Sequence, residues 1–113
     1  MSEFTYLFRG RQVASSREQM QMTMQKWAAW FKELTVQGHL KEPGHPLEHS
    51  GKTVKGSEKI IIDGPFPEAK DVIGGYVVIE ATDLDQAVEL AKGCPILDVE
   101  GSVEVRPIQQ INL

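Results

Sequence analysis

At residues 63–71 the chain reads DGPFPEAKD, and this stretch ends the apolar strand predicted at Ile60-Ile61-Ile62. Gly64 can adopt backbone angles that other residues avoid, while Pro65 lacks a backbone donor and keeps its predecessor out of the helical region. The chain therefore has to leave strand geometry here. The stretch also gathers ionisable side chains, which makes it the first candidate for a functional site: Asp63, Glu68, Lys70 and Asp71.

The residues just before this stretch predict a hairpin. Lys52–Val54 and Glu58–Ile62 flank the turn Lys55–Ser57, a length and composition that suit a hairpin containing Gly. Further upstream, His39–Ser57 contains several Pro and Gly residues and few apolar ones. We therefore predict a loop there that leads into the hairpin.

A helix is predicted from Arg17 to Gln37. Ser16 and Gln19 form a capping-box pattern at its start, and Gly38 is a suitable stop. Apolar residues recur every three or four positions and predict a stripe that packs on a sheet: Met20, Met24, Trp27, Phe31 and Leu34. For Trp30, on the flank of that stripe, core packing and a ligand-binding role both remain open.

The remaining elements are three strands and a second helix. Phe4–Arg9 alternates, with Phe4, Tyr6 and Phe8 on one face, whereas Tyr76–Ala81 is apolar on both faces and is expected to lie centrally. A helix is predicted to begin with Thr82 and Asp85 in capping-box register, and its apolar side consists of Leu84, Ala87, Val88 and Ala91. The final strand is predicted at Val103–Ile108, with Glu104 and Arg106 on the face opposite Val103 and Val105.

This order of elements favours an α+β fold, a ferredoxin-like sandwich with an inserted hairpin and both helices on one face of the sheet. The other face would leave an apolar surface uncovered. We therefore expect two sheets to pack together in a homodimer, as a dimeric α+β barrel.

Length and composition limit the classes of function. The 113 residues correspond to a single domain, residues 1–113, and 41% hydrophobic with 25% charged residues is ordinary for a soluble protein. The net charge of −4, with Lys and Arg scattered among acids, argues against binding nucleic acid. Neither an apolar run long enough to span a membrane nor a signal peptide is recognisable, so we expect a cytoplasmic protein with no membrane partner. The single Cys94 is expected to be a reduced, partly buried thiol.

Several of these motifs together resemble one family. They are the run Asp63-Gly64-Pro65-Phe66 with Glu68 and Lys70, then Gly74-Gly75-Tyr76, Asp83-Leu84-Asp85, Cys94-Pro95 and Gly101–Pro107. From Phe4 to Ile108 the chain is similar to the YCII-related, DGPF-motif proteins, although it has Pro67 and Asp71 where the usual motif has Ala and Glu. The resemblance implies a dimeric α+β barrel. Members are mostly uncharacterised, some are similar to proteins encoded beside extracytoplasmic-function sigma factors, and an enzymatic role has been suggested from a polar pocket and, in a shorter branch, a His-Asp pair. In this chain His39 stands where relatives often carry an apolar residue.

Charged residues supply a candidate site if the final strand neighbours the strand that precedes residue 63. We expect Asp63 as a catalytic acid or base, with Arg106 pairing an anionic group of a small organic ligand. Further ligand-binding candidates are Glu104, Lys70, Glu68 and Trp30. The alternative is structural: Asp63 accepts backbone hydrogen bonds in the turn, and Glu104 and Arg106 form a cross-strand ion pair.

His39, His45 and His49 suggest a metal site, but Pro46 interrupts the helical spacing of His45 and His49, so a solvated loop without metal is favoured. Nucleotide fingerprints, a Gly-rich phosphate loop and a Ser-His-Asp order are absent from the sequence, and we expect no cofactor. Two functions remain. One is a small enzyme that performs cofactor-independent acid–base chemistry on a small organic molecule, and the other is a non-catalytic ligand-binding or interaction module in a regulatory or stress circuit.

Overall fold

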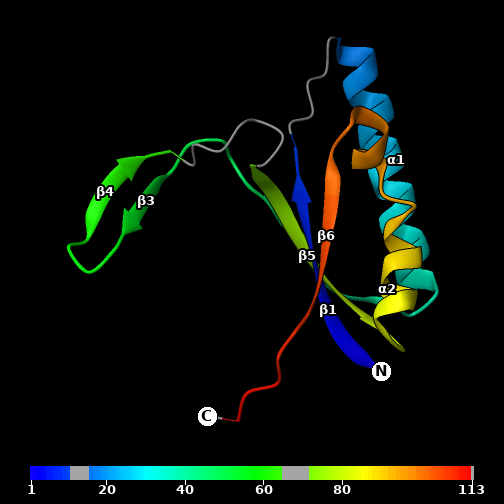
Figure 1. Cartoon of the computed structure of the whole chain (residues 1–113). Helices are drawn as coiled ribbons and strands as arrows, with labels where there is room; N and C mark the ends of the chain where they lie inside the picture. The colour runs from blue at the N-terminus through cyan, green and yellow to red at the C-terminus, as the bar shows by residue number, and fades with distance from the viewer. Residues whose placement is uncertain (11–15, 65–71, 113) are drawn as a thin grey trace.

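The computed structural model describes residues 1–10, 16–64 and 72–112 (Figure 1). Its elements are, in chain order, β1 (Ser2–Arg9), α1 (Arg17–Val36), β2 (Leu40–Pro46), β3 (Lys52–Lys55), β4 (Ile60–Asp63), β5 (Ile73–Ala81), α2 (Leu84–Ala91), the 3₁₀ helix η2 (Pro95–Val99) and β6 (Ser102–Pro107). In the described part of the chain, each helix is too short or too polar to cross a membrane.

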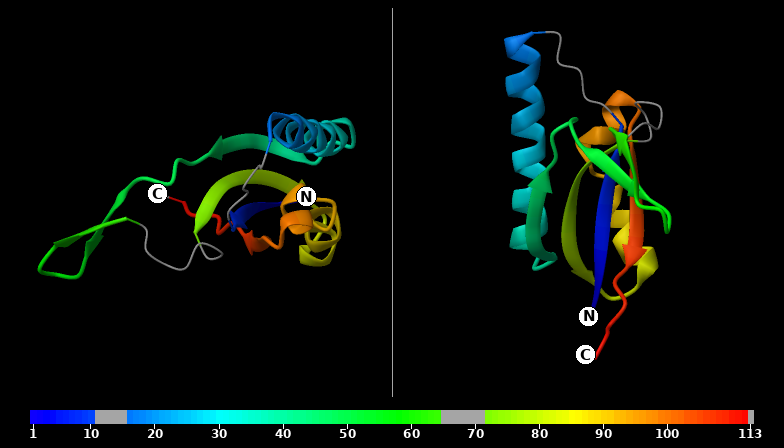
Figure 2. Two further views of the ribbon diagram at one scale, coloured as in Figure 1. Left: turned by 90° about the horizontal axis from the view of Figure 1, so that it is seen from above. Right: turned by 90° about the vertical axis from the view of Figure 1, so that its left-hand side faces the viewer.

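Four strands form one antiparallel sheet in the order β2-β5-β1-β6, and both helices cover one of its faces (Figures 1 and 2). This mixed α+β architecture agrees with the predicted fold class. The alternation predicted for β1 is confirmed, because Phe4, Tyr6 and Phe8 are buried beneath the helices. The face of the sheet away from the helices, here called the open face, includes the half-buried side chains of Leu7 and Val78.

The core joins this sheet to the two helices. Aromatic and aliphatic side chains of β1 and β5 meet Trp30 and Leu34 of α1 and two alanines of α2, Ala87 and Ala91. Tyr6 is fully buried, and its hydroxyl donates to the Ala87 carbonyl at 2.6 Å. Burial of the phenol raises the pKa of Tyr6 far above its usual value, so this hydroxyl stays protonated and acts as a donor.

The predicted caps are partly correct. For α1, the Ser16 hydroxyl accepts from the Gln19 backbone N–H, and Gly38 follows the helix with a φ of +80°, as expected. For α2, the predicted pair of Thr82 and Asp85 is wrong. Asp83 is the N-cap and accepts from the Gln86 N–H, while the Gln86 side chain accepts from Thr82.

The predicted loop at His39–Ser57 is also wrong in its first part, because it contains β2. This strand pairs with β5 at the edge of the sheet, and its register shifts twice between Leu40 and His45. Pro43, Gly44 and Pro46 make the segment unlike a strand in sequence, but an edge strand with irregular pairing accommodates them.

Strands β3 and β4 form a separate two-stranded sheet with Lys52 paired to Asp63 and Lys55 to Ile60. It projects away from the four-stranded sheet on the side opposite the helices (Figures 1 and 2). This sheet, here called the hairpin arm, is exposed at all eight strand residues.

Candidate functional site

The principal cavity of the described residues lies between α1, β2 and the start of β5. It has a volume of about 700 Å³, within the range of roughly 300–1,000 Å³ that is usual for small-molecule sites. We call it the α1–β2 cavity. Its lining residues include Met20, Met24, Trp27, Phe31, His45, His49 and Tyr76.

One wall comes from the N-terminal half of α1. Met20 and Met24 are 53% and 66% exposed, so their predicted place in the core is wrong. The 20 residues of α1 span about 30 Å, and its first turns extend past the end of the sheet (Figure 1). The stripe is therefore continuous in sequence, but only Trp30 and Leu34 of α1 are buried, and Trp27 and Phe31 are partly buried.

The aromatic residues of this wall contact one another. The ring centroids of Trp27 and Phe31 are 6.0 Å apart with nearly parallel planes, and Phe8 meets Trp27 edge-on at 5.0 Å. Thioethers and indole rings offer polarisable, adaptable surfaces to an apolar ligand. This wall is suited to bind a flat or aromatic group.

The opposite wall comes from β2 and the residues after it, with Tyr76 of β5 behind them. His45 lies beside Tyr76, with the two ring centroids 6.1 Å apart in an edge-on arrangement. Gly44, just before His45, has a φ of +63°, and an added Cβ there would lie 1.8 Å from the Tyr76 carbonyl oxygen. The close approach of the two strands at Gly44 thus holds the backbone of β2, including that of His45, against β5 at the edge of the cavity.

A second cavity of about 570 Å³ is lined by residues of the sheet, of the hairpin arm and of the segment between β2 and β3. Its charged lining residues are Arg9, Glu48 and Lys52, and Gly64 and Val72 also line it. Pro46 and Leu47 line both cavities, which are therefore neighbours.

The predicted catalytic residue Asp63 ends β4 on the hairpin arm. Its carboxylate accepts from Lys52 Nζ at 2.6 Å, and its side chain is 80% exposed. Gly64 follows with a φ of +102°, so the chain does leave strand geometry at the predicted position. Asp63 is not among the described residues that line either of these two cavities.

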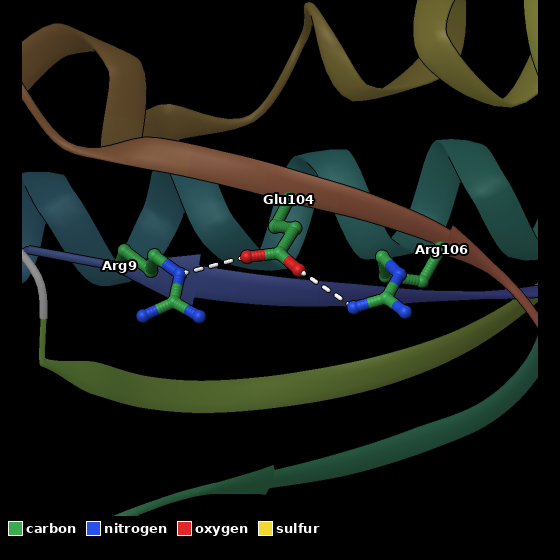
Figure 3. A network of polar contacts seen from close by, with 3 residues as sticks. All are labelled: Arg9, Glu104 and Arg106. Atoms are coloured by element: carbon green, nitrogen blue, oxygen red, sulfur yellow. Dashed lines mark hydrogen bonds and ion pairs between the residues drawn. The ribbon is translucent and has the colours of Figure 1, made fainter.

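Glu104 and Arg106 lie on the open face, joined to Arg9 (Figure 3). Glu104 accepts from Arg9 Nε at 3.0 Å and from Arg106 Nη1 at 3.1 Å. These hydrogen bonds, first from Arg106 and then from Arg9, hold the pKa of Glu104 below its usual value. The ion pair predicted between Glu104 and Arg106 exists, but it runs along one strand, and Arg9 supplies the contact across strands.

The expectation that the final strand neighbours the one preceding Asp63 is wrong. β6 pairs with β1, whereas β4 pairs with β3 in the separate sheet. In a single chain, Arg106 and Asp63 therefore lie on different sheets. Glu68 and Lys70, the other charged candidates of the motif, lie outside the described residues.

Trp30 is a core residue. Only 6% of it is exposed, it stacks on Tyr6 at 5.9 Å, and its indole N–H donates to the Leu90 carbonyl at 3.2 Å. Trp30 is not among the described residues that line the α1–β2 cavity or the second cavity, whereas Trp27, one turn earlier, lines the α1–β2 cavity. The predicted ligand-binding role thus falls on the neighbouring tryptophan.

We expect Trp30→Phe to lower the free energy of unfolding by about 1–3 kcal/mol, because it removes the indole donor to Leu90 and reduces the buried volume. Urea denaturation measures this change. We expect ligand binding in the α1–β2 cavity to stay within about twofold at saturating folded protein. A variant that keeps full stability but loses binding would restore Trp30 as a binding residue.

Sequence reasoning missed the histidine residues that line this site. His45 and His49 were assigned to a solvated loop, and both are exposed, but both line the α1–β2 cavity. Among the described residues no group of three or more His, Cys, Asp or Glu side chains could hold a metal ion. The length of the apolar stripe of α1 could have predicted this wall. The stripe is longer than the sheet can cover, because it begins at Met20 in the first turns of α1, which extend past the end of the sheet (Figure 1).

Comparison with known proteins places the chain in a family. The sequence profile described as the YCII-related domain matches residues 4–112, nearly the whole chain. This chain belongs to the YCII-related family. The resemblance inferred from the sequence motifs is therefore confirmed.

Two individual similarities accompany the family match. An uncharacterised protein of Rhizobium meliloti (strain 1021), R00369, is 38% identical to the YCII-related chain over 63 residues, which is 55% of this chain and 47% of that protein. The match therefore spans about half the length of the relative. The structure of 5-chloro-2-hydroxyhydroquinone dehydrochlorinase (TftG) from Burkholderia phenoliruptrix AC1100, in complex with 2,5-dihydroxybenzoquinone, has a TM-score of 0.48 and 15% identity, over 95% of this chain and 93% of that chain.

Proposed function

We propose that this YCII-related protein is a small enzyme that performs cofactor-independent acid–base chemistry on a small organic molecule bound in the α1–β2 cavity. The observation that carries the proposal is the pairing of an apolar methionine and aromatic wall with a wall that contains His45 and His49. A cavity of this size with few polar groups suits one small ligand. Imidazole is the side chain that most often transfers protons in enzymes.

In this proposal the α1 wall holds the apolar body of the ligand, and His49, which lines the same cavity, exchanges a proton with it. His45 pairs with Tyr76, and Tyr76 pairs with Leu7, so the rings of His45 and Tyr76 lie on the side of the open face. His45 therefore contributes to the cavity through the backbone of β2 and takes no part in the proton transfer.

An anionic group on the ligand fits the neighbouring cavity. Arg9 and Lys52 line that cavity, and guanidinium and ammonium groups bind carboxylates and phosphates. Glu104, with Arg106 on its other oxygen, positions Arg9, and Asp63 positions Lys52. The residues predicted from the sequence thus act in this proposal through the cations that line the cavity.

The binding step is tested with a pair of fluorescent probes that share an aromatic body: anilinonaphthalene sulfonate, which is anionic, and phenylnaphthylamine, which is neutral. We expect both to bind and Met24→Glu to weaken both at least tenfold, because it places a charge in the apolar wall. Met22→Glu is the matched control, since Met22 is a similarly exposed methionine of α1, 59% exposed, that does not line the described cavities. Equal affinities for the two variants would contradict the proposed cavity.

The chemical step is tested with phenylpyruvate, an aromatic anion with exchangeable C–H protons. We expect the protein to accelerate deuterium uptake from solvent, measured by proton NMR, and His49→Gln to reduce that acceleration on the order of 100-fold while binding persists. His45→Gln is the matched control and should leave the acceleration within about twofold. Binding without any acceleration would favour the alternative function. Acceleration that His49→Gln leaves unchanged would exclude His49 as the acid or base.

The alternative is a non-catalytic ligand-binding or interaction module in a regulatory or stress circuit. One observation favours it: Asp63 and Glu104, the two acidic site candidates that the structure describes, are paired carboxylates in contact with solvent. Asp63 is 80% exposed, and the pKa of Glu104 is lowered rather than raised. Neither environment favours a general acid at neutral pH.

We also propose that the protein is a homodimer, with the open face as the contact surface. Half-buried apolar side chains of that face, Leu7 and Val78, have no covering layer among the residues that the structure describes. Two charge clusters flank them: Lys41 between Glu3 and Glu80, and Glu104 between Arg9 and Arg106. A two-fold rotation can place the acidic cluster of one copy against the basic cluster of the other.

A further inference from the structure

The hairpin arm is apolar on both of its faces. Val54 and Ile61 pair across the strands on one face, while Ile60 and Ile62 lie on the other. Val54, Ile60 and Ile61 are 67%, 54% and 66% exposed. Charged residues surround them at the turn and at the base: Lys52, Lys55, Glu58, Lys59 and Asp63.

An isolated two-stranded sheet is at best marginally stable in water and requires a third strand or a packed surface. Every residue of β3 and β4 is exposed, so the chain itself supplies no such surface among the described residues. Solvent-facing isoleucines on both faces of a projecting sheet are the pattern of a contact with another molecule. The arm therefore needs a partner for its stability.

The direction of the arm limits what that partner can be. It projects on the side of the sheet opposite the helices, which is the side of the open face (Figures 1 and 2). The second cavity marks the corner between them, with Arg9 and Ile73 contributed by the sheet and Lys52 and Thr53 by the arm. Whatever packs on the open face therefore lies beside the arm.

We propose that the occupant is a second copy of this chain and that the hairpin arm of each copy packs along the side of the other. The inference rests on the homodimer proposed above. The open face favours a second copy because its two charge clusters are complementary to each other, and the surface of the arm is continuous with that face through the corner. Each arm then buries isoleucines that are exposed in the single chain.

The dissociation constant of the dimer tests the arm, measured by analytical ultracentrifugation for the full chain. Ile60→Asn and Ile61→Asn each change one face of the arm, and we expect at least one of them to weaken the dimer tenfold or more. Val36→Asn is the matched control, because Val36 is an exposed apolar residue, 76% exposed, at the end of α1. Far-UV circular dichroism verifies that each variant is folded.

A second measurement locates the contact. A photoreactive benzoylphenylalanine at position 54 is irradiated in a mixture of isotopically heavy and light chains, and cross-linked peptides are identified by mass spectrometry. We expect heavy-to-light cross-links to β1, β5 or β6. A monomeric wild-type protein would overturn both the dimer and the arm. A wild-type dimer that both arm variants leave within twofold, with cross-links confined to one chain, would overturn the arm alone.

Discussion

Gly44→Ala is expected to abolish probe binding in the α1–β2 cavity and to lower the free energy of unfolding by about 3 kcal/mol or more. The added Cβ would lie 1.8 Å from the Tyr76 carbonyl oxygen and 2.7 Å from its carbonyl carbon. Both atoms belong to the backbone of β5, so no side-chain rotation relieves the overlap. The pairing of β2 with β5 has to open, and His45 moves with β2 out of the wall that it shares with Tyr76.

The matched control is Gly56→Ala at the turn of the hairpin arm. Gly44 and Gly56 have φ angles of +63° and +75°, but an added Cβ at Gly56 meets no atom within 4 Å. Both variants carry the strain of a left-handed alanine, and only Gly44→Ala carries the overlap. Thermal denaturation should show a midpoint loss of more than about 10 °C for Gly44→Ala and of a few degrees for Gly56→Ala. Equal losses of the midpoint would show that the overlap between the added Cβ and the Tyr76 carbonyl does not destabilise Gly44→Ala.

The core elements follow from the sequence because each contains one dominant periodic signal. Phe4, Tyr6 and Phe8 alternate, and the structure buries all three beneath the helices. Val103 and Val105 pack against the core from the opposite edge strand, as their spacing predicts. In these strands the side chain and the backbone favour the same conformation, so local patterns suffice.

β2 could not be recognised in the same way. Pro43, Gly44 and Pro46 are residues that break strands in isolation, and the energy that keeps them extended comes from pairing with β5, about thirty residues away in the chain. The site depends on this long-range pairing, since β2 carries His45. A site wall built on an irregular edge strand is therefore hidden from local sequence patterns.

The ion pairs of the charged residues were also only partly predictable from the sequence. Their chemical types were predicted correctly as ion-pairing groups, but their partners depend on which strands are neighbours. The sequence patterns did not predict Arg9 as a site residue, although Arg9 both contacts Glu104 and lines a cavity. The register of β1 with β6 brings Arg9 near Glu104, and that register is a property of the folded sheet.

For function, the arrangement separates two kinds of residue. The apolar wall of α1 faces a wall formed by β2 and by His49 after it, and a ligand fits between them, whereas Asp63 and Arg106 are held in solvent-facing ion pairs. A surface ion pair contributes little to stability, about 0–1 kcal/mol. In the proposed site these ion pairs therefore serve to position the side chains of Lys52 and Arg9.

Cys94 is expected to react with a disulfide reagent on the order of a thousandfold more slowly in the native protein than in the urea-unfolded chain at pH 8. Only 2% of the residue is exposed, and burial raises the pKa of its thiol to about 12. At pH 8 a thiol with this pKa is ionised in roughly one molecule in ten thousand, whereas an unfolded thiol with a pKa of about 8.5 is ionised in about a quarter. The thiolate is the reactive species, so the difference in ionisation alone gives the expected factor.

The sign of the pH dependence provides an independent check. The folded pKa is raised, so the native thiol stays protonated and its reaction rate should keep rising through pH 10, while the rate of the unfolded chain should level off above about pH 9. Since Cys94 is the single cysteine of the chain, colour released from Ellman's reagent reports this site alone. Val36→Cys in a Cys94→Ser background is the matched control, because Val36 is 76% exposed at the end of α1 and its replacement should react at nearly the unfolded rate. Native Cys94 reacting within tenfold of that control would show that the junction between α2 and η2 opens readily, which its place in the hydrophobic core argues against.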